Sequence, residues 1–153
     1  MTESAQKQAE MPNWMLHLNR EFAFPVEKVF SAWTEPEALK GWFCNSGVAE
    51  FNPVVGGQFY VQMVTEKFGA LELTGEYLEI IKNEKIKFTW KWLTEPLTQA
   101  GETVVTVEFL ARDNSTEIKL THEGFTTEEF KNNHTEGWDF AMENFEKVLK
   151  EQG

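Results

Sequence analysis

Three histidines and one cysteine are the side chains of this sequence that could most directly support metal binding or nucleophilic chemistry. His17, His122 and His134 do not pair with one another at the spacing of a metal-ligand motif. Cys44 has no second cysteine with which to hold zinc or form a disulfide bond. We therefore expect no metal site and no cofactor in this chain.

General acid–base catalysis requires a titratable side chain inside a cavity, and His122 is the candidate that the sequence favours. It continues the parity of Ile118 and Leu120, so its side chain is predicted to lie on the apolar face of a strand. The alternative is a structural histidine near a strand end, hydrogen-bonded to the backbone or to Glu123. His134 is interpreted as a histidine on the surface of a helix.

Aromatic side chains are the strongest sign of a binding site, because large rings line ligand pockets as well as building cores. The chain has 13 Phe, 6 Trp and 2 Tyr. Three of these rings alternate along residues 86–92 and so share one face of a strand. We predict a cavity for an apolar ligand with these lining residues, some of which are expected to be plain core: Trp42, Phe59, Phe88, Trp90, Trp92, Phe109, His122, Trp138 and Met142.

The first third of the chain is predicted to form a strand and two short helices. Apolar and polar residues alternate over 14–24, which is typical of a strand with one buried face. Pro25 is expected in the first turn of a helix. The Thr-x-x-Glu spacing of Thr34 and Glu37 predicts a capping box that starts a second helix.

The middle of the chain reads as a run of strands, and its end as one helix. Strands are predicted over 48–54, 59–64, 68–81, 86–92, 105–109 and 118–122, separated by turn residues. Gly75 inside the third of these indicates a bulge or a sharp bend. A second Thr-x-x-Glu pattern at Thr126 starts an amphipathic helix that runs to Leu149, with Gly137 as a possible break.

This order of elements predicts an α+β fold. Consecutive strands with short turns favour a curved antiparallel sheet of about six or seven strands, wrapped around the long C-terminal helix. Two short helices follow the first strand. We expect residues 1–12 to be a flexible N-terminal tail and residues 13–153 to form a single domain.

The acidic composition narrows the range of partners. A formal net charge of −11 argues against nucleic acid and against an anionic membrane surface, since both are bound through clustered Lys and Arg. No apolar run approaches the roughly 20 residues that a membrane span needs. Residues 1–12 also lack the apolar stretch of a signal peptide. We therefore expect a cytoplasmic protein.

Several stretches taken in order resemble the SRPBCC superfamily of START-like, helix-grip (Bet v-like) proteins, and most of all the homologues of the C-terminal domain of the heat-shock-protein-90 ATPase activator. The stretches are residues 20–30, 33–37 with Trp42, 56–59, 75–80, 86–90, 120–125 and 137–138. The resemblance extends over roughly residues 14–149 and implies a hydrophobic cavity between the sheet and the long helix. It implies no particular activity, because the superfamily includes carriers, receptors and cyclases.

Three functions are consistent with this reading. The first is the binding of a small apolar or aromatic ligand in the cavity. The second is a partner-binding, co-chaperone-like or stress-response module that presents its acidic surface to a basic patch on another protein. The third is a cyclase-like or hydrolase-like enzyme that uses the cavity, with His122 or a buried Glu as the acid–base group.

Overall fold

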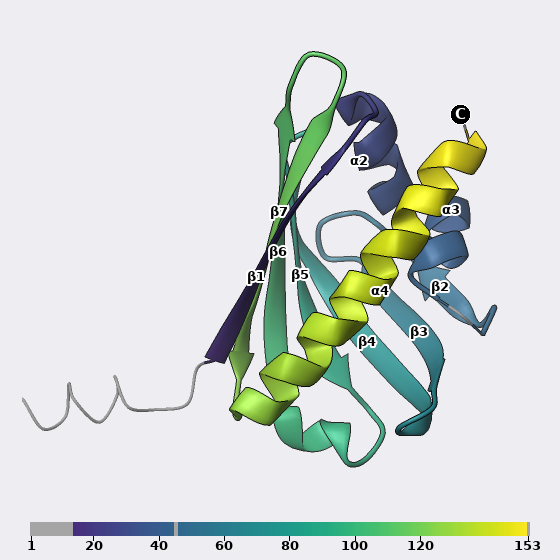
Figure 1. The fold of residues 1–153 in the computed structure, drawn as a ribbon. Coiled ribbons are helices and arrows are strands. Elements are labelled where there is room, and N and C mark those ends of the chain that lie inside the picture. The colour runs from purple at the N-terminus through teal and green to yellow at the C-terminus, as the bar shows by residue number, and fades with distance from the viewer. Residues whose placement is uncertain (1–13, 45, 153) are drawn as a thin grey trace, which may run out of the picture.

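The computed structural model describes residues 14–44 and 46–152, which form one antiparallel sheet and the helices that cover it. The sheet has the strand order β1-β7-β6-β5-β4-β3-β2, so every strand except β1 pairs with its neighbour in the sequence. This arrangement confirms the predicted α+β fold (Figure 1). The predicted tail, residues 1–12, lies outside the described residues. The elements are β1 (Trp14–Phe22), α2 (Val26–Thr34), α3 (Pro36–Trp42), β2 (Ala49–Phe51), β3 (Gln58–Thr65), β4 (Gly69–Ile81), β5 (Lys85–Trp92), η1 (Leu97–Ala100), β6 (Glu102–Ala111), β7 (Thr116–Phe125) and α4 (Glu128–Gln152).

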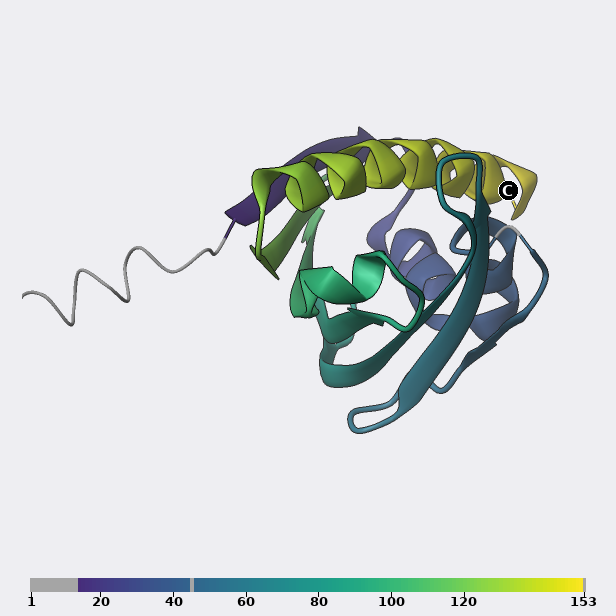
Figure 2. The same ribbon diagram turned by 90° about the horizontal axis from the view of Figure 1, so that it is seen from below.

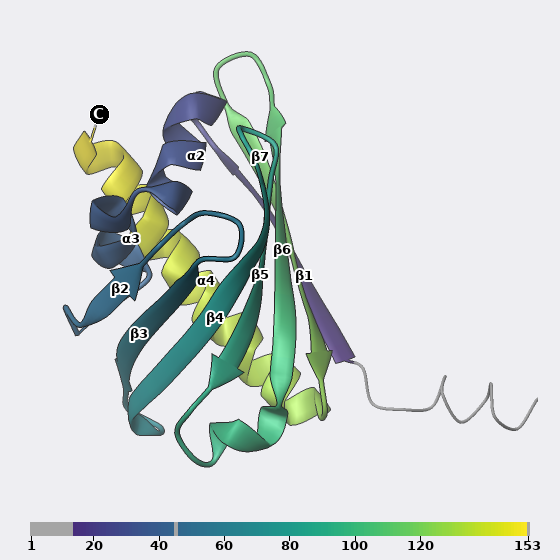
Figure 3. The ribbon, with the colours of Figure 1, turned by 180° about the vertical axis from the view of Figure 1, so that it is seen from behind.

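Helix α4 crosses the open side of the curved sheet, as the view from below shows (Figure 2). Helices α2 and α3 fill the space beside the C-terminal half of α4, while none of the described helices covers the other face of the sheet (Figure 3). The contact is close, because a Cβ added at Gly41 of α3 would lie 3.3 Å from a methyl group of Val148. Within the described range, no helix is long and apolar enough to cross a membrane.

Strand β5 shows how the alternation of side chains builds the core. Phe88 and Trp90 are buried, while Lys87 is half-buried and Lys91 is exposed on the opposite face. The predicted inward face of this strand is therefore confirmed. Because successive side chains of a strand point to opposite faces, the sheet supplies a continuous apolar surface toward α4.

Gly75 allows the sheet to bend closely over a phenylalanine ring. A Cβ added there would lie 2.1 Å from the Thr89 carbonyl oxygen and 2.4 Å from Cε2 of Phe59, so no larger residue fits. The backbone N–H of Glu76 donates to the Thr89 hydroxyl instead of to a carbonyl, at 2.8 Å. The register of β4 against β5 then shifts after Tyr77.

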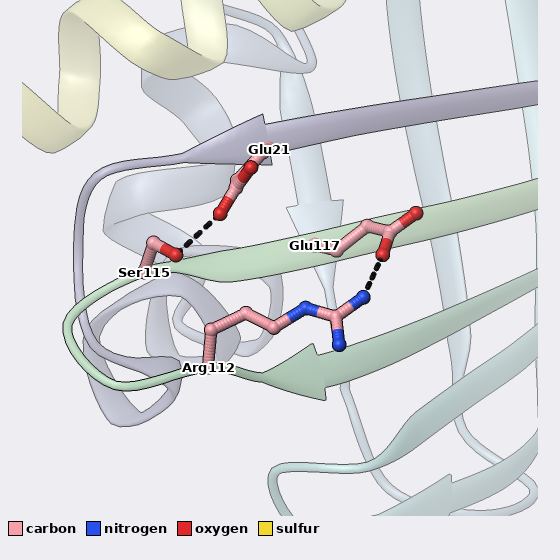
Figure 4. A network of polar contacts seen from close by, with 4 residues as sticks. All are labelled: Glu21, Arg112, Ser115 and Glu117. Carbon is pink, nitrogen blue, oxygen red and sulfur yellow. Dashed lines mark hydrogen bonds and ion pairs between the residues drawn. The ribbon is translucent and has the colours of Figure 1, made fainter.

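Polar contacts fix the far end of the sheet, where β1 ends beside the turn between β6 and β7 (Figure 4). Ser115 in that turn donates a hydrogen bond to the Glu21 carboxylate of β1. Arg112 forms an ion pair with Glu117 across the same turn. These contacts hold the first strand of the chain against a hairpin formed almost one hundred residues later.

The predicted start signals of the helices are wrong by one residue. Thr34 ends α2, where its hydroxyl donates to the Phe30 carbonyl at 3.1 Å. Glu35 is the N-cap of α3, because the residue before a proline is held in extended backbone (φ −92°, ψ 125°). Likewise, Pro25 precedes the first turn of α2 instead of lying within it.

At α4 the capping residue is Thr127 and not Thr126. The helix begins at Glu128, and the Thr127 hydroxyl accepts a hydrogen bond from the Phe130 N–H at 3.1 Å. The helix continues without a break through Gly137. The strand predicted over residues 48–54 is also shorter, since only Ala49–Phe51 pair with β3 at the edge of the sheet.

Candidate functional site

A pocket of about 450 Å³ lies between α4 and the strands β3, β4 and β5. Helix α3, the turn between β3 and β4, and η1 complete its wall. Most of the wall is apolar, and the polar side chains in it are few. The lining residues are Trp42, Phe43, Met63, Val64, Thr65, Glu66, Phe68, Leu71, Trp90, Trp92, Leu97, Asn133, His134, Gly137, Trp138, Phe140, Ala141 and Asn144.

The structure separates the predicted cavity residues into two groups. Four tryptophans from three parts of the chain line the pocket: Trp42, Trp90, Trp92 and Trp138. The other five are buried without lining it: Phe59, Phe88, Phe109, His122 and Met142. Strand parity predicts the buried face of a strand, but it does not predict which ring on that face meets the hollow.

The rim and floor of the pocket include residues that the sequence analysis did not select. Leu71 and Met63 could have been found, because they share the inward parity of β4 and β3. No pattern in the sequence indicated that Gly137 and Phe140 line the pocket. Gly137 lines the pocket with its bare backbone, and Phe140 has 62% of its surface exposed at the pocket edge.

His122 is a fully buried histidine whose two ring nitrogens are both engaged. The Trp138 indole N–H donates to Nδ1 at 3.0 Å, and an indole is only a donor, so Nδ1 is unprotonated. Nε2–H then donates to the Thr103 hydroxyl at 2.7 Å, and that hydroxyl donates to the Trp90 carbonyl at 3.2 Å. Burial, with a smaller contribution from His134, lowers the pKa of His122 well below its usual value.

His134 is held in the same way, with the opposite tautomer. The Trp92 indole N–H donates to Nε2 at 2.8 Å, and Nδ1–H donates to the Phe130 carbonyl at 2.7 Å. The side chain is only 7% exposed, so the predicted surface position is wrong. Burial lowers the pKa of His134 to about 4, against an opposing effect of the Phe130 carbonyl.

The two Trp–His pairs form one layer at the inner wall of the pocket. The His122 and His134 ring centroids are 5.3 Å apart, and Trp90 packs against both rings. Both histidines are neutral at pH 7 and have no free nitrogen to offer a substrate. The arrangement fixes the orientation of the indoles of Trp92 and Trp138, which face the pocket.

Trp90 lies at the centre of this aromatic wall. Its ring contacts Phe43, Trp92 and Trp138 as well as the two histidines. Its indole N–H has no hydrogen-bond partner within residues 14–44 and 46–152, in contrast to the other three tryptophans of the pocket. Trp90 is therefore held by ring packing alone.

Cys44 is not placed to act as a nucleophile in this pocket. Its thiol is buried and lies 3.5 Å from the Val48 carbonyl, to which it donates. A second contact of 3.6 Å joins it to the Ser46 hydroxyl. The described residues also contain no group of three or more His, Cys, Asp or Glu that could hold a metal ion.

Residues 23–150 match the family model described as "Activator of Hsp90 ATPase homolog 1-like protein". The chain belongs to this family. The match extends from before α2 to near the end of α4 and so includes every residue named above in the pocket wall. The resemblance noted in the sequence is thereby confirmed. None of the curated proteins compared with the chain matches it.

Solved structures of the same helix-grip fold come from several bacteria. A protein from Rhizobium leguminosarum shares 21% identity, with a TM-score of 0.76, over 91% of this chain and 95% of that one. A protein of unknown function from Staphylococcus aureus shares 17% identity, with a TM-score of 0.79, over 94% and 98%. A protein from Chromobacterium violaceum shares 22% identity, with a TM-score of 0.76, over 88% and 96%. At these identities the likeness shows the fold alone.

Proposed function

We propose that this member of the activator-homologue family binds a small, largely apolar aromatic molecule in the pocket beneath α4. The observation that carries the proposal is a pocket of about 450 Å³ walled by four tryptophans and by Phe43, Phe68 and Leu71. Ligand sites in proteins range from roughly 300 to 1,000 Å³ and are mostly apolar. The volume suits a molecule of two or three fused rings.

The fixed orientation of the indoles supports binding more than catalysis. Trp42 donates to the Ala32 carbonyl at 2.9 Å, and Trp92 and Trp138 donate to the two histidines. A wall held in this way meets a flat ligand without reordering, which lowers the entropic cost of binding. General acid–base catalysis would need a free titratable group inside the pocket, but both nitrogens of His134 are engaged and Glu66 lies exposed at the edge.

Gly137 gives a sharp test of the site. It lines the pocket, and a Cβ added there would meet nothing within 4 Å. Gly137→Leu should therefore fill part of the pocket without a clash. Gly137→Ala is the matched control, because it makes the same change in helix backbone with only a methyl group in the pocket.

Native mass spectrometry of the freshly purified protein tests the proposal directly. We expect the native chain and Gly137→Ala to carry a bound small molecule, or to take one up from a mixture of polycyclic aromatic compounds, and Gly137→Leu to carry none. Equal occupancy in all three proteins would place the ligand elsewhere. If no adduct were found, either in the purified protein or after its incubation with the mixture of aromatic compounds, the proposal would be wrong.

A partner-binding role is a second candidate, favoured by the name of the family and by the acidity of the chain. A net charge of −11 suits a partner with a basic patch. The family description refers to activation of the Hsp90 ATPase. If the chain has such a role, adding it to a purified Hsp90 should raise the rate of ATP hydrolysis, and about 0.5 M salt should abolish the effect by screening. An unchanged rate at low salt would exclude this role for the Hsp90 tested.

A further inference from the structure

The charges around the pocket are unequal, and they indicate the chemical class of the ligand. Among the described residues that line the pocket, Glu66 is the only Asp or Glu, none is Lys or Arg, and His134 is neutral. Glu66 is exposed in the turn that follows β3, and so lies at the rim. The interior of the pocket therefore offers a buried anion no cationic partner.

Helix α4 adds further negative charge beside the exposed ring of Phe140. Glu136 and Glu143 precede and follow this ring by four and three residues, so they are its neighbours on the helix surface. Both glutamates are exposed. The rim thus combines an apolar ring, open to solvent, with carboxylates from α4 and from the turn between β3 and β4.

Lys67 is a cation next to this rim, and its ammonium group contacts an amide oxygen and an aromatic ring. Its ammonium group donates to the Asn133 side-chain oxygen at 3.3 Å. It also lies 5.4 Å from the centroid of the Phe68 ring, which lines the pocket. The rim therefore already holds one ammonium group between an aromatic face and an amide oxygen. An ammonium group is thus compatible with this rim, and a ligand amine would use aromatic faces other than that of Phe68.

We propose that the pocket selects molecules with an aromatic body and a positively charged amine, with the rings buried among the tryptophans and the amine at the rim near Glu66. The inference rests on the proposed function and adds the class of ligand to it. An ammonium group at the rim gains from the carboxylates and from the aromatic faces. A carboxylate of the same shape meets repulsion at the rim and loses its hydration deeper in the pocket without a partner.

Three probes of one shape separate charge from ring burial: naphthylmethylamine, naphthylmethanol and naphthoate, all substituted at the same ring position. Their dissociation constants can be measured by calorimetry at neutral pH and low salt. We expect the dissociation constant of the amine to be lower than that of the carboxylate by a factor of about ten or more, with the alcohol between them. A difference of this size is what a few charges at a solvent-exposed rim can produce, because the dielectric constant there is high. Raising the salt to about 1 M should narrow the difference between the amine and the alcohol, because salt screens the attraction to the rim carboxylates.

Charge-neutralising variants locate the effect. Glu66→Gln, Glu136→Gln and Glu143→Gln combined should reduce the preference for the amine over the carboxylate to about twofold or less, and should weaken binding of the amine far more than binding of the alcohol. The matched control combines Glu50→Gln, Glu76→Gln and Glu108→Gln on the sheet, none of which lines this pocket. It removes the same net charge and should keep the preference.

The outcomes distinguish this inference from the function on which it rests. If all three probes bind with equal affinity, or the carboxylate binds most tightly, the pocket is a ligand site but the charge selection is wrong. If the sheet variant loses the preference as fully as the rim variant, the selection comes from the overall charge and the rim assignment is wrong. If no probe binds, both the inference and the proposed site are overturned.

Discussion

Two tryptophan–histidine hydrogen bonds help to satisfy the ring nitrogens of two buried histidines, His122 and His134. In each pair an indole donates to an unprotonated ring nitrogen, and the other ring nitrogen donates to a hydroxyl or a carbonyl. A polar side chain can be buried without a large cost only when its hydrogen-bonding groups find partners. Here the donors and acceptors match, and the histidines remain neutral.

Truncating one of these donors should cost more than its ring area suggests. Trp138→Phe keeps an aromatic ring but leaves Nδ1 of His122 without a donor, so we expect a loss of about 1–3 kcal/mol in the free energy of unfolding beyond the packing loss. Urea denaturation measures the difference. Trp90→Phe is the control, since its indole N–H has no partner in the described part of the chain. Equal losses in the two variants would show that the hydrogen bond contributes nothing.

Acid should weaken the fold through the same histidines. The pKa of His134 is about 4 in the folded protein and near 6.5 in the unfolded chain, so the unfolded state binds more protons between these values. The stabilisation is therefore complete above pH 6.5 and declines as the pH falls toward 4, by about 1 kcal/mol per pH unit. Burial shifts the pKa of His122 in the same direction.

Urea denaturation at several pH values between 7 and 5 tests this dependence. His134→Gln is the informative variant, because a glutamine oxygen can accept from Trp92 but does not titrate. We expect a shallower decline of stability with falling pH in this variant than in the native chain. The same decline in both proteins would assign the acid sensitivity to other groups.

The sequence predicts which side chains face the interior better than it predicts which residues these side chains contact. Phe88 and Trp90 share one face of β5, yet only Trp90 reaches the pocket, because Phe88 packs against Phe59 and Tyr77. His134 could have been placed correctly, since it precedes Trp138 by four residues and so shares its face of α4. The hydrogen bonds between α4 and the sheet join residues too distant in sequence for any periodicity to pair them.

At the scale of elements, the order of strands and helices could be predicted, whereas their first residues could not. The Thr-x-x-Glu spacing fits Thr126 with Glu129, whereas Thr127 has Phe130 three residues after it, so spacing alone favours the wrong threonine. Backbone geometry selects Thr127, whose hydroxyl reaches the Phe130 N–H. The shift of one residue matters for mutagenesis, because it moves the energetic effect to a different threonine.

Thr127→Ala should therefore destabilise the protein, by about 1 kcal/mol, through loss of the hydrogen bond at the start of α4. Thr126→Ala, at the preceding residue, is the matched control. Its exposed hydroxyl makes only a 3.4 Å contact with the Gln99 carbonyl, and we expect a loss below about 0.5 kcal/mol. Thermal unfolding followed by circular dichroism compares the two. A larger effect at Thr126 would contradict the assigned helix start.

At the scale of the whole molecule, the pocket results from the curvature of the sheet around α4. This curvature is a property of several strands together and of no single element. The sheet packs closely over Phe59 at Gly75. It wraps around α4, while α2 and α3 fill only the part of the interior beside the C-terminal half of the helix (Figure 2). The space left beside the N-terminal half is bounded by the turn between β3 and β4 and by η1. The sequence indicates such a hollow through its surplus of aromatic residues, but its rim at Gly137 and Phe140 depends on the path of the helix.

This geometry makes a joint prediction about fluorescence and stability. Four of the six tryptophans line the pocket, so a bound aromatic molecule must contact indole rings and change their emission. Binding to the native state alone should also stabilise it, by about 2.7 kcal/mol at a free concentration one hundred times the dissociation constant. Titration with naphthylmethanol, followed by tryptophan emission and by melting temperature, should give one dissociation constant from both signals. Gly137→Leu should abolish both changes while keeping the circular dichroism spectrum, and Gly137→Ala should retain them. A rise in melting temperature without any change in emission would place the ligand outside the tryptophan-lined pocket.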